Sequence, residues 1–161
     1  MMKKLFSSTM IVLVLLIVVA STSFAASAAT EKQLIFKGTL QAVETHVVTF
    51  PTFSLDATGS GNATQLGLYT MSFQAVVYIP TLSGTGTATL VAADGSSLYA
   101  DSMGQGTPTE NPDFVSIVEM YTITGGTGRF AGASGSFTVE RVIQRSTGVS
   151  SGTISGTIVL P

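Results

Sequence analysis

Two side chains of opposite charge occupy matching positions in one hairpin of the sequence. Residues 117–143 contain two alternating runs joined by a glycine-rich link, a pattern typical of two antiparallel strands and a structured loop. If the hairpin is symmetric about Phe130, paired residue numbers add up to 260, and Glu119 then faces Arg141. The same register pairs apolar residues of the odd-numbered face: Ile123 with Phe137, Tyr121 with Val139, and Ile117 with Ile143.

This odd-numbered face is mostly apolar, so we expect it to be buried with both charges on it. Directly opposed residues of antiparallel strands have Cβ atoms about 5 Å apart, which is close enough for Glu119 and Arg141 to form an ion pair. Such a pair could anchor a carboxylate or hydroxyl of an apolar ligand. Alternatively, the two charges could satisfy only each other in the core, and the sequence favours this simpler role.

Glu44 and His46 form a second candidate group. They are two residues apart, so on a regular strand both point to the same side. His46 is the only histidine, and a Glu–His couple could supply a general base and its orienting group. A strand end facing solvent is the simpler interpretation. A metal ion would need a third ligand, which the spacing does not supply, so we expect neither a metal nor a cofactor.

Tyr69 and Tyr121 complete the polar candidates for the interior. Tyrosines on an apolar face are more often core residues with an anchored hydroxyl than catalytic acids. No nucleophile motif is present, because the segment around Ser134 lacks the Gly-x-Ser-x-Gly spacing and the following turn into a helix. We therefore assign no catalytic residue, and the sequence does not predict an enzyme.

The elements that must position these residues are strands. The runs 34–50 and 65–79 alternate over long distances, and the pair Asp94-Gly95 is a strong signal for a two-residue hairpin turn. Beyond Glu44 the first run either continues inward or resets its parity. We expect a polar loop over 104–112. The full set of seven or eight strands also includes 54–62, 84–93, 96–103, the two runs of the 117–143 hairpin, and 149–160.

Such a chain can close into a barrel or stack two sheets. Glycines recur inside the strands, for example at Gly38, Gly86 and Gly156, and such kinks help a sheet to curl. We therefore predict an all-β fold, a single closed antiparallel barrel of about eight strands. The faces opposite the apolar ones carry Thr, Ser and Gln, which favours a soluble barrel over a membrane barrel.

The first 28 residues are predicted to be a signal peptide. Lys3 and Lys4 precede an apolar run over 10–20 and then small residues, the succession that marks secretory leaders. The apolar run is shorter than the roughly 20 residues of a membrane span. Cleavage is expected after Ala25 or Ala28, which leaves a secreted domain over 29–161 with no membrane span.

The charge of the mature chain limits the kinds of partner it can bind, and the cysteine content indicates its source. With Lys3 and Lys4 removed, the mature chain keeps five basic and nine acidic residues, a formal net charge of −4. No basic cluster exists, which argues against nucleic acid as a partner. Secreted eukaryotic domains of this size often carry disulfides, so the absence of cysteine favours a bacterial source.

The glycine-rich link resembles the loop of the allene oxide cyclase and dirigent barrel-like superfamily. The matching stretch reads GGTGRFAGASG over 125–135, and the stretch GNATQLG over 61–67 is also similar to uncharacterised bacterial secreted members. The resemblance implies a single eight-stranded antiparallel barrel. Plant cyclases of this superfamily act on an unstable fatty-acid epoxide, and dirigent proteins steer radical coupling. Neither catalytic pattern carries over residue by residue, so an activity inferred from the fold would be analogy.

In this loop we expect structural roles. Phe130 would plug one end of the barrel, and Arg129 would donate hydrogen bonds to loop carbonyls. The remaining loop residues of interest are the glycines Gly125, Gly126, Gly128, Gly132 and Gly135.

Three functions fit these observations. The first is a secreted barrel that binds a small apolar molecule in its lumen, with Glu119, Arg141, Tyr121, Tyr69, Glu44 and His46 as candidate contacts. The second is a cyclase- or isomerase-like enzyme that uses Glu119, Arg141 or Tyr121. The third is a purely structural extracellular module, which requires a filled lumen. The sequence does not specify an oligomeric state.

Overall fold

A computed structural model describes residues 31–161 of the chain. The predicted signal peptide and both predicted cleavage positions therefore lie outside the described residues.

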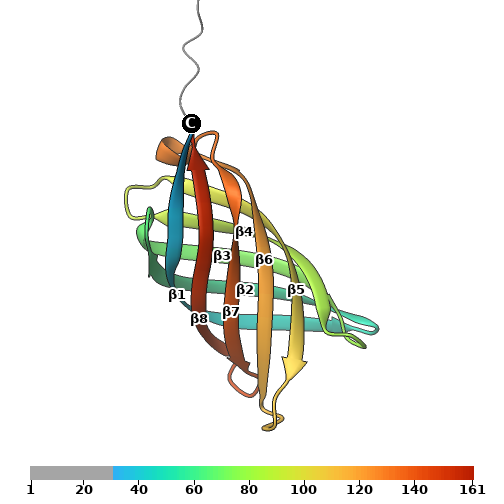
Figure 1. The fold of residues 1–161 in the computed structure, drawn as a ribbon. Coiled ribbons are helices and arrows are strands. Elements are labelled where there is room, and N and C mark those ends of the chain that lie inside the picture. Colours follow the sequence, from blue (N-terminus) through green and yellow to red (C-terminus); the bar gives the residue numbers. More distant parts are fainter. Residues whose placement is uncertain (1–30) are drawn as a thin grey trace, which may run out of the picture.

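The described chain is a closed antiparallel barrel of eight strands in which each strand pairs with its neighbours in sequence, and β1 closes the ring against β8 (Figure 1). The predicted all-β barrel is thus confirmed. Its only helical element within 31–161 is the 3₁₀ turn η1 (Gly128–Phe130), and no helix there is long and apolar enough to cross a membrane. The strands are β1 (Lys32–Thr49), β2 (Thr52–Ala63), β3 (Gly67–Tyr78), β4 (Ser83–Ala92), β5 (Ser97–Pro108), β6 (Phe114–Gly126), β7 (Ser134–Gln144) and β8 (Val149–Leu160).

The alternation in the sequence becomes an inside and an outside of the barrel. In β1 the buried side chains are even-numbered, from Phe36 through Leu40 and Ala42 to Glu44. The parity therefore does not reset at Glu44, and β1 is one long strand. Gly38 stays in the regular ladder, opposite Ala63. A methyl group at Gly38 would overlap the Ala63 side chain, so this glycine permits a close approach of the strands rather than a bulge.

The predicted register of the β6–β7 hairpin is wrong by two residues. Ile117 pairs with Arg141 and Glu119 pairs with Val139, so paired numbers add up to 258 instead of 260. The link is not symmetric about Phe130, because β6 stays paired with β5 as far as Gly126 after its ladder with β7 has ended at Ile123. The odd-numbered side chains nevertheless face inward, as predicted.

The predicted polar loop over 104–112 is also wrong in extent. Strand β5 continues to Pro108 and pairs with β6 along this stretch, so that Gly104 lies opposite Glu119. The glycines at 104 and 106 conceal the strand pattern, because they place no side chain on the inward face while Gln105 and Thr107 face outward.

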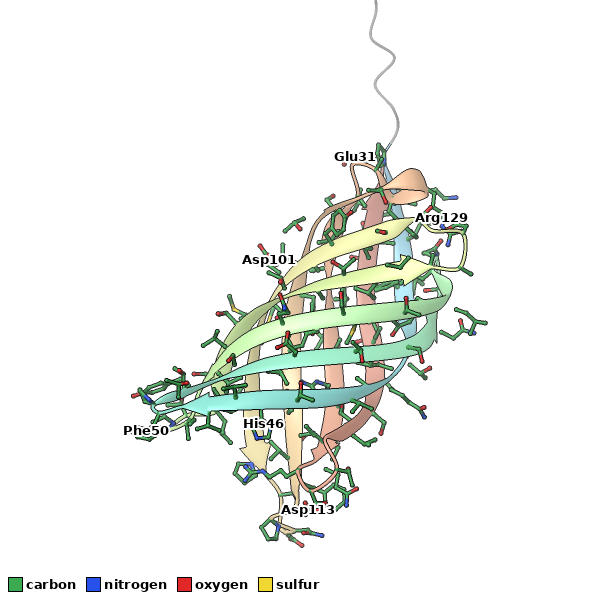
Figure 2. All side chains as sticks on the ribbon, turned by 180° about the vertical axis from the view of Figure 1, so that it is seen from behind. Glu31, His46, Phe50, Asp101, Asp113 and Arg129 are labelled. Carbon is green, nitrogen blue, oxygen red and sulfur yellow. The ribbon has the colours of Figure 1, made fainter. Side chains whose placement is uncertain are left out.

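The two ends of the barrel differ. At the end that holds η1 the lumen is filled by large apolar side chains with at most 2% exposure, namely Phe36, Leu66, Leu90, Leu98, Phe130 and Ile158. We call this the packed half. The other end, reached by going from Tyr121 back towards Phe114 along β6, is the open half. Arg129 and Asp113 mark the two opposite ends in Figure 2.

Candidate ligand-binding cavity

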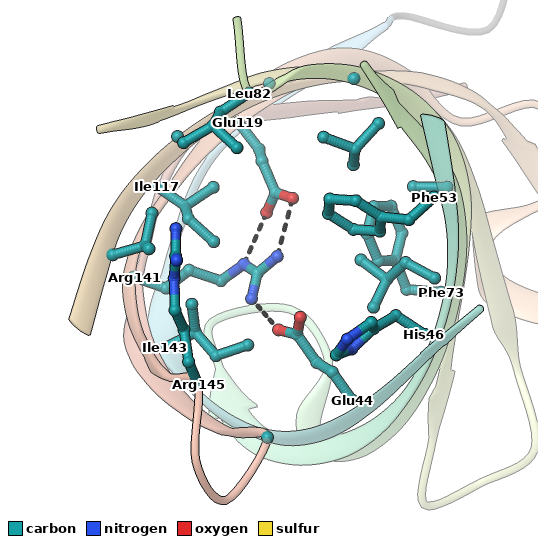
Figure 3. Close-up of a pocket in the computed structure, with 18 of the residues that line it drawn as sticks. Glu44, His46, Phe53, Phe73, Leu82, Ile117, Glu119, Arg141, Ile143 and Arg145 are labelled. Carbon is teal, nitrogen blue, oxygen red and sulfur yellow. Dashed lines mark hydrogen bonds and ion pairs between the residues drawn. The ribbon is translucent and has the colours of Figure 1, made fainter. Parts of the chain in front are cut away.

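The open half encloses a cavity of about 710 Å³. Its wall is mostly apolar and includes Val48, Phe53, Leu55, Phe73, Val77, Ile79, Leu82, Val115, Ile117 and Ile143. A volume of this size lies within the range of small-molecule sites in proteins. Figure 3 shows the charged side chains crossing this lumen, with Phe53, Phe73 and His46 on the facing wall.

Glycines create part of this space. Gly84 on β4 and Gly104 and Gly106 on β5 line the cavity where other strands present side chains. A methyl group at Gly104 would lie 2.7 Å from Cγ of Glu119, well inside van der Waals contact. Glycine at this position therefore leaves room for the Glu119 side chain to extend into the lumen.

A buried cluster of three charges forms the inner end of the cavity. Nε and Nη2 of Arg141 donate to the two carboxylate oxygens of Glu119 at 2.9 and 3.0 Å, in a bidentate arrangement. Nη1 of Arg141 donates to Oε1 of Glu44 on the other side. We call Glu44, Glu119 and Arg141 the charge cluster, and each residue is at most 8% exposed. The predicted ion pair of Glu119 and Arg141 is therefore present, on diagonal rather than directly opposed positions.

The electrostatics of Arg141 follow from these contacts. Burial alone lowers the pKa of its guanidinium, but the hydrogen bonds and charge of Glu119, followed by the charge of Glu44, outweigh that effect and raise it above the ordinary value. Arg141 thus remains a cation, and it holds two carboxylates that come from β1 and β6.

Sequence reasoning missed Glu44 as the second partner of Arg141. The interpretation of Glu44 as a strand end facing solvent is wrong, because the carboxylate points into the lumen and is buried. The even parity of the apolar residues of β1 was the signal that could have found it. Nothing in the sequence placed β1 close to β7, since the two strands come together only when the ring closes, on either side of β8.

His46 lies nearer the mouth than Glu44. It is exposed, lines the cavity, and packs its ring edge-on against Phe53 with centroids 5.7 Å apart. Among the hydrogen bonds of the described chain none joins Glu44 to His46, so the Glu–His couple is not formed. No group of three or more His, Cys, Asp or Glu side chains within 31–161 is arranged to hold a metal ion.

The two tyrosines lie outside the cavity wall. Tyr69 belongs to the packed half, donates its hydroxyl to the carbonyl of Thr39 at 2.9 Å, and has its pKa raised to about 12 by burial. Tyr121 stacks on Phe137 and donates to Oε2 of Glu119 at 3.3 Å. Burial, followed by the charge of Glu119, raises the pKa of Tyr121 far above its usual range. Both hydroxyls therefore stay protonated and anchor the core.

The glycine-rich link closes the packed half. Phe130 is buried at its centre, and Nη2 of Arg129 donates to the carbonyl of Leu66 in the β2–β3 turn at 3.0 Å. Nη1 of Arg129 also pairs with Asp94 in the β4–β5 turn at 3.3 Å. Four glycines of the link, Gly125, Gly128, Gly132 and Gly135, have positive φ, which explains their residue type; Gly126 does not.

Comparison with known proteins supports the fold. No family model matches the chain, and no curated protein matches it. A solved structure of a pterocarpan synthase dirigent protein is similar over 88% of this chain and 99% of that one, with a TM-score of 0.58 and 13% sequence identity. At this identity the likeness concerns architecture alone. The chain has a dirigent-like eight-stranded barrel fold.

Proposed function

We propose that the mature protein is a secreted, soluble barrel that binds a small apolar molecule in the open half of its lumen. The observation that carries this proposal is the cavity of about 710 Å³, apolar along its wall and closed at its inner end by the charge cluster. An apolar wall with a few converging polar groups is the usual composition of a ligand site.

The cavity helps to decide between ligand binding, a purely structural role and an enzymatic role. A purely structural module would gain stability from filling its lumen, as the packed half does, because close packing is the normal state of protein interiors. An open half of this size therefore favours binding over a structural role. No observation favours the cyclase- or isomerase-like alternative in particular. Tyr121 does not line the cavity, and Glu119 and Arg141, which do line it, are hydrogen-bonded to one another.

Export and source are parts of the same proposal. The leader over 1–28, with cleavage after Ala25 or Ala28, motivates secretion, and the absence of cysteine motivates a bacterial source. Amino-terminal sequencing of protein recovered from the medium should begin at Ala26 or Ala29. A membrane-bound product that still starts at Met1 would contradict export.

Binding can be tested with a neutral apolar fluorophore, N-phenyl-1-naphthylamine, on the mature barrel. Its fluorescence should rise on binding to the wild-type protein and fall back in Ala75→Phe, which fills the cavity from β3. The matched control is Val76→Phe, because the neighbouring side chain points outward and is 54% exposed. Equal fluorescence in the two variants, or none in the wild type, would contradict lumen binding. Native mass spectrometry of protein from its own host would then identify a retained ligand.

A further inference from the structure

The charge cluster is not neutral. It contains two carboxylates and one guanidinium, all buried, so its formal charge is −1. The two oxygens of Glu119 and Oε1 of Glu44 each accept a hydrogen bond from Arg141. Oε2 of Glu44 accepts none from the described chain, and Figure 3 shows this carboxylate inside the lumen, between Arg141 and His46. One carboxylate oxygen of a nine-tenths buried side chain is thus left for a partner in the cavity.

From this arrangement we propose that the cavity takes an amphiphile with a cationic head, in the form of a primary ammonium group bound against Glu44 and an apolar tail along the wall. The proposal rests on the proposed function and specifies its ligand class. A buried charge is costly unless it is paired, and a cation at Oε2 of Glu44 would bring the inner end of the cavity to a net charge of zero. An ammonium also supplies the hydrogen-bond donors that this oxygen lacks.

A ligand carboxylate is disfavoured at the same place. The guanidinium of Arg141 has five N–H groups, of which three donate to Glu119 and Glu44. A ligand carboxylate bound to the remaining two N–H groups would be the third carboxylate around one cation. It would change the local charge from −1 to −2. Like charges repel more strongly at a buried site than in water, so a ligand carboxylate, one of the two head groups expected from the sequence, does not fit the charge cluster.

The other charged groups around the cavity support this orientation of the ligand. Arg145 lines the mouth but is exposed, so water screens its charge. A cationic head gains nothing near Arg145 and is attracted at the inner end by the charge cluster. The wall between these two ends is mostly apolar, with Phe53, Phe73 and Ile117 among its members, although His46, Thr85 and Ser102 also line it.

Three probes of equal chain length test the proposal on the mature wild-type barrel: decylammonium, decanol and decanoate, each measured by isothermal titration calorimetry near pH 7. We expect decylammonium to bind about tenfold more tightly than decanol, and decanoate to bind most weakly. A tenfold difference corresponds to about 1.4 kcal/mol. Decanol or decanoate binding as tightly as decylammonium would overturn the cationic head while leaving lumen binding intact. Failure of all three probes would instead count against the proposed function itself.

Variants then locate the head group. Glu44→Gln should abolish most of the tenfold preference for decylammonium over decanol, because it removes the unpaired carboxylate oxygen but keeps the side-chain shape. Glu140→Gln is the matched control, since Glu140 is an exposed carboxylate on the outer face of β7, next to Arg141 in sequence. Circular dichroism must show both variants folded. A preference that survives Glu44→Gln, or falls equally in Glu140→Gln, would contradict the assigned position.

Discussion

The packed and open halves of the lumen are built by the same strands, and β4 and β5 show the contrast best. Going from the packed end to the mouth, the inward residues of β4 change from Leu90 through Ala88 to Gly84. Those of β5 change from Leu98 through Ala100 to Gly104. From Leu90 on β4 and from Leu98 on β5 to the mouth, the inward residues thus change from leucine to alanine, serine and glycine, while the alternation stays intact. Alternation decides which residues face the lumen, and their size decides whether the lumen is a core or a cavity.

The largest effect on the free energy of unfolding is expected at the charge cluster, which lies between the packed half and the open half. Arg141→Met would leave Glu44 and Glu119 buried without their cation, which should lower the free energy of unfolding by about 3–5 kcal/mol. Urea denaturation monitored by circular dichroism would measure it. The control is the triple variant Glu44→Gln, Glu119→Gln and Arg141→Met, which keeps the shape without any charge and should lose much less. Equal losses in the two proteins would show that packing, not charge, decides stability there.

Next comes a comparison of one phenylalanine from each half. Phe130→Ala removes a fully buried ring from the packed half and should lower the free energy of unfolding by about 3–4 kcal/mol, as large-to-small core substitutions do. Phe53→Ala removes a partly buried ring that already borders the cavity, so its loss should be below about 2 kcal/mol. The same urea experiment applies, and similar losses would mean that the open half is packed in solution.

The sequence predicted the fold through features that are local. Hairpin signals such as Asp94-Gly95 and the regular alternation in β3 and β6 predicted the strand order and the inward faces. Closure was predicted from glycines inside the strands, which in the structure permit close approach of neighbouring strands, as at Gly38. The register of β6 against β7 could not be predicted from the sequence, because it depends on how far β6 remains paired with β5 near Gly126. The cavity was equally hidden, since glycines at 84 and 104 give no apolar pattern. Glu44 reaches Arg141 only because the ring closes.

A smaller effect is expected from the arginines at the two ends. Arg129→Ala breaks the hydrogen bond to the Leu66 carbonyl and the half-exposed pair with Asp94, which together should contribute about 1–1.5 kcal/mol to the free energy of unfolding. Arg145→Ala at the mouth breaks no side-chain hydrogen bond or ion pair described within 31–161, and should change it by less than about 0.5 kcal/mol. Thermal melts of both variants would measure this, and an equal loss would contradict the bracing role of Arg129.

The smallest effect is expected when the pH is lowered, at the β5–β6 loop that borders the mouth. Asp113, in the β5–β6 loop, accepts hydrogen bonds from Nε2 of Gln144 and from both the amide and the hydroxyl of Ser146. These bonds, led by the one from Gln144, hold the pKa of Asp113 below its ordinary value of 3.8. A carboxylate with a lowered pKa in the folded state stabilises it above the unfolded pKa, and that contribution is lost as the pH falls through the folded value. The amide proton shift of Ser146, followed by NMR between pH 6 and pH 2, should therefore move with a midpoint below 3.8. In Asp113→Asn that transition should be absent, because an amide side chain does not titrate, and a wild-type midpoint at or above 3.8 would show that Asp113 does not hold the loop.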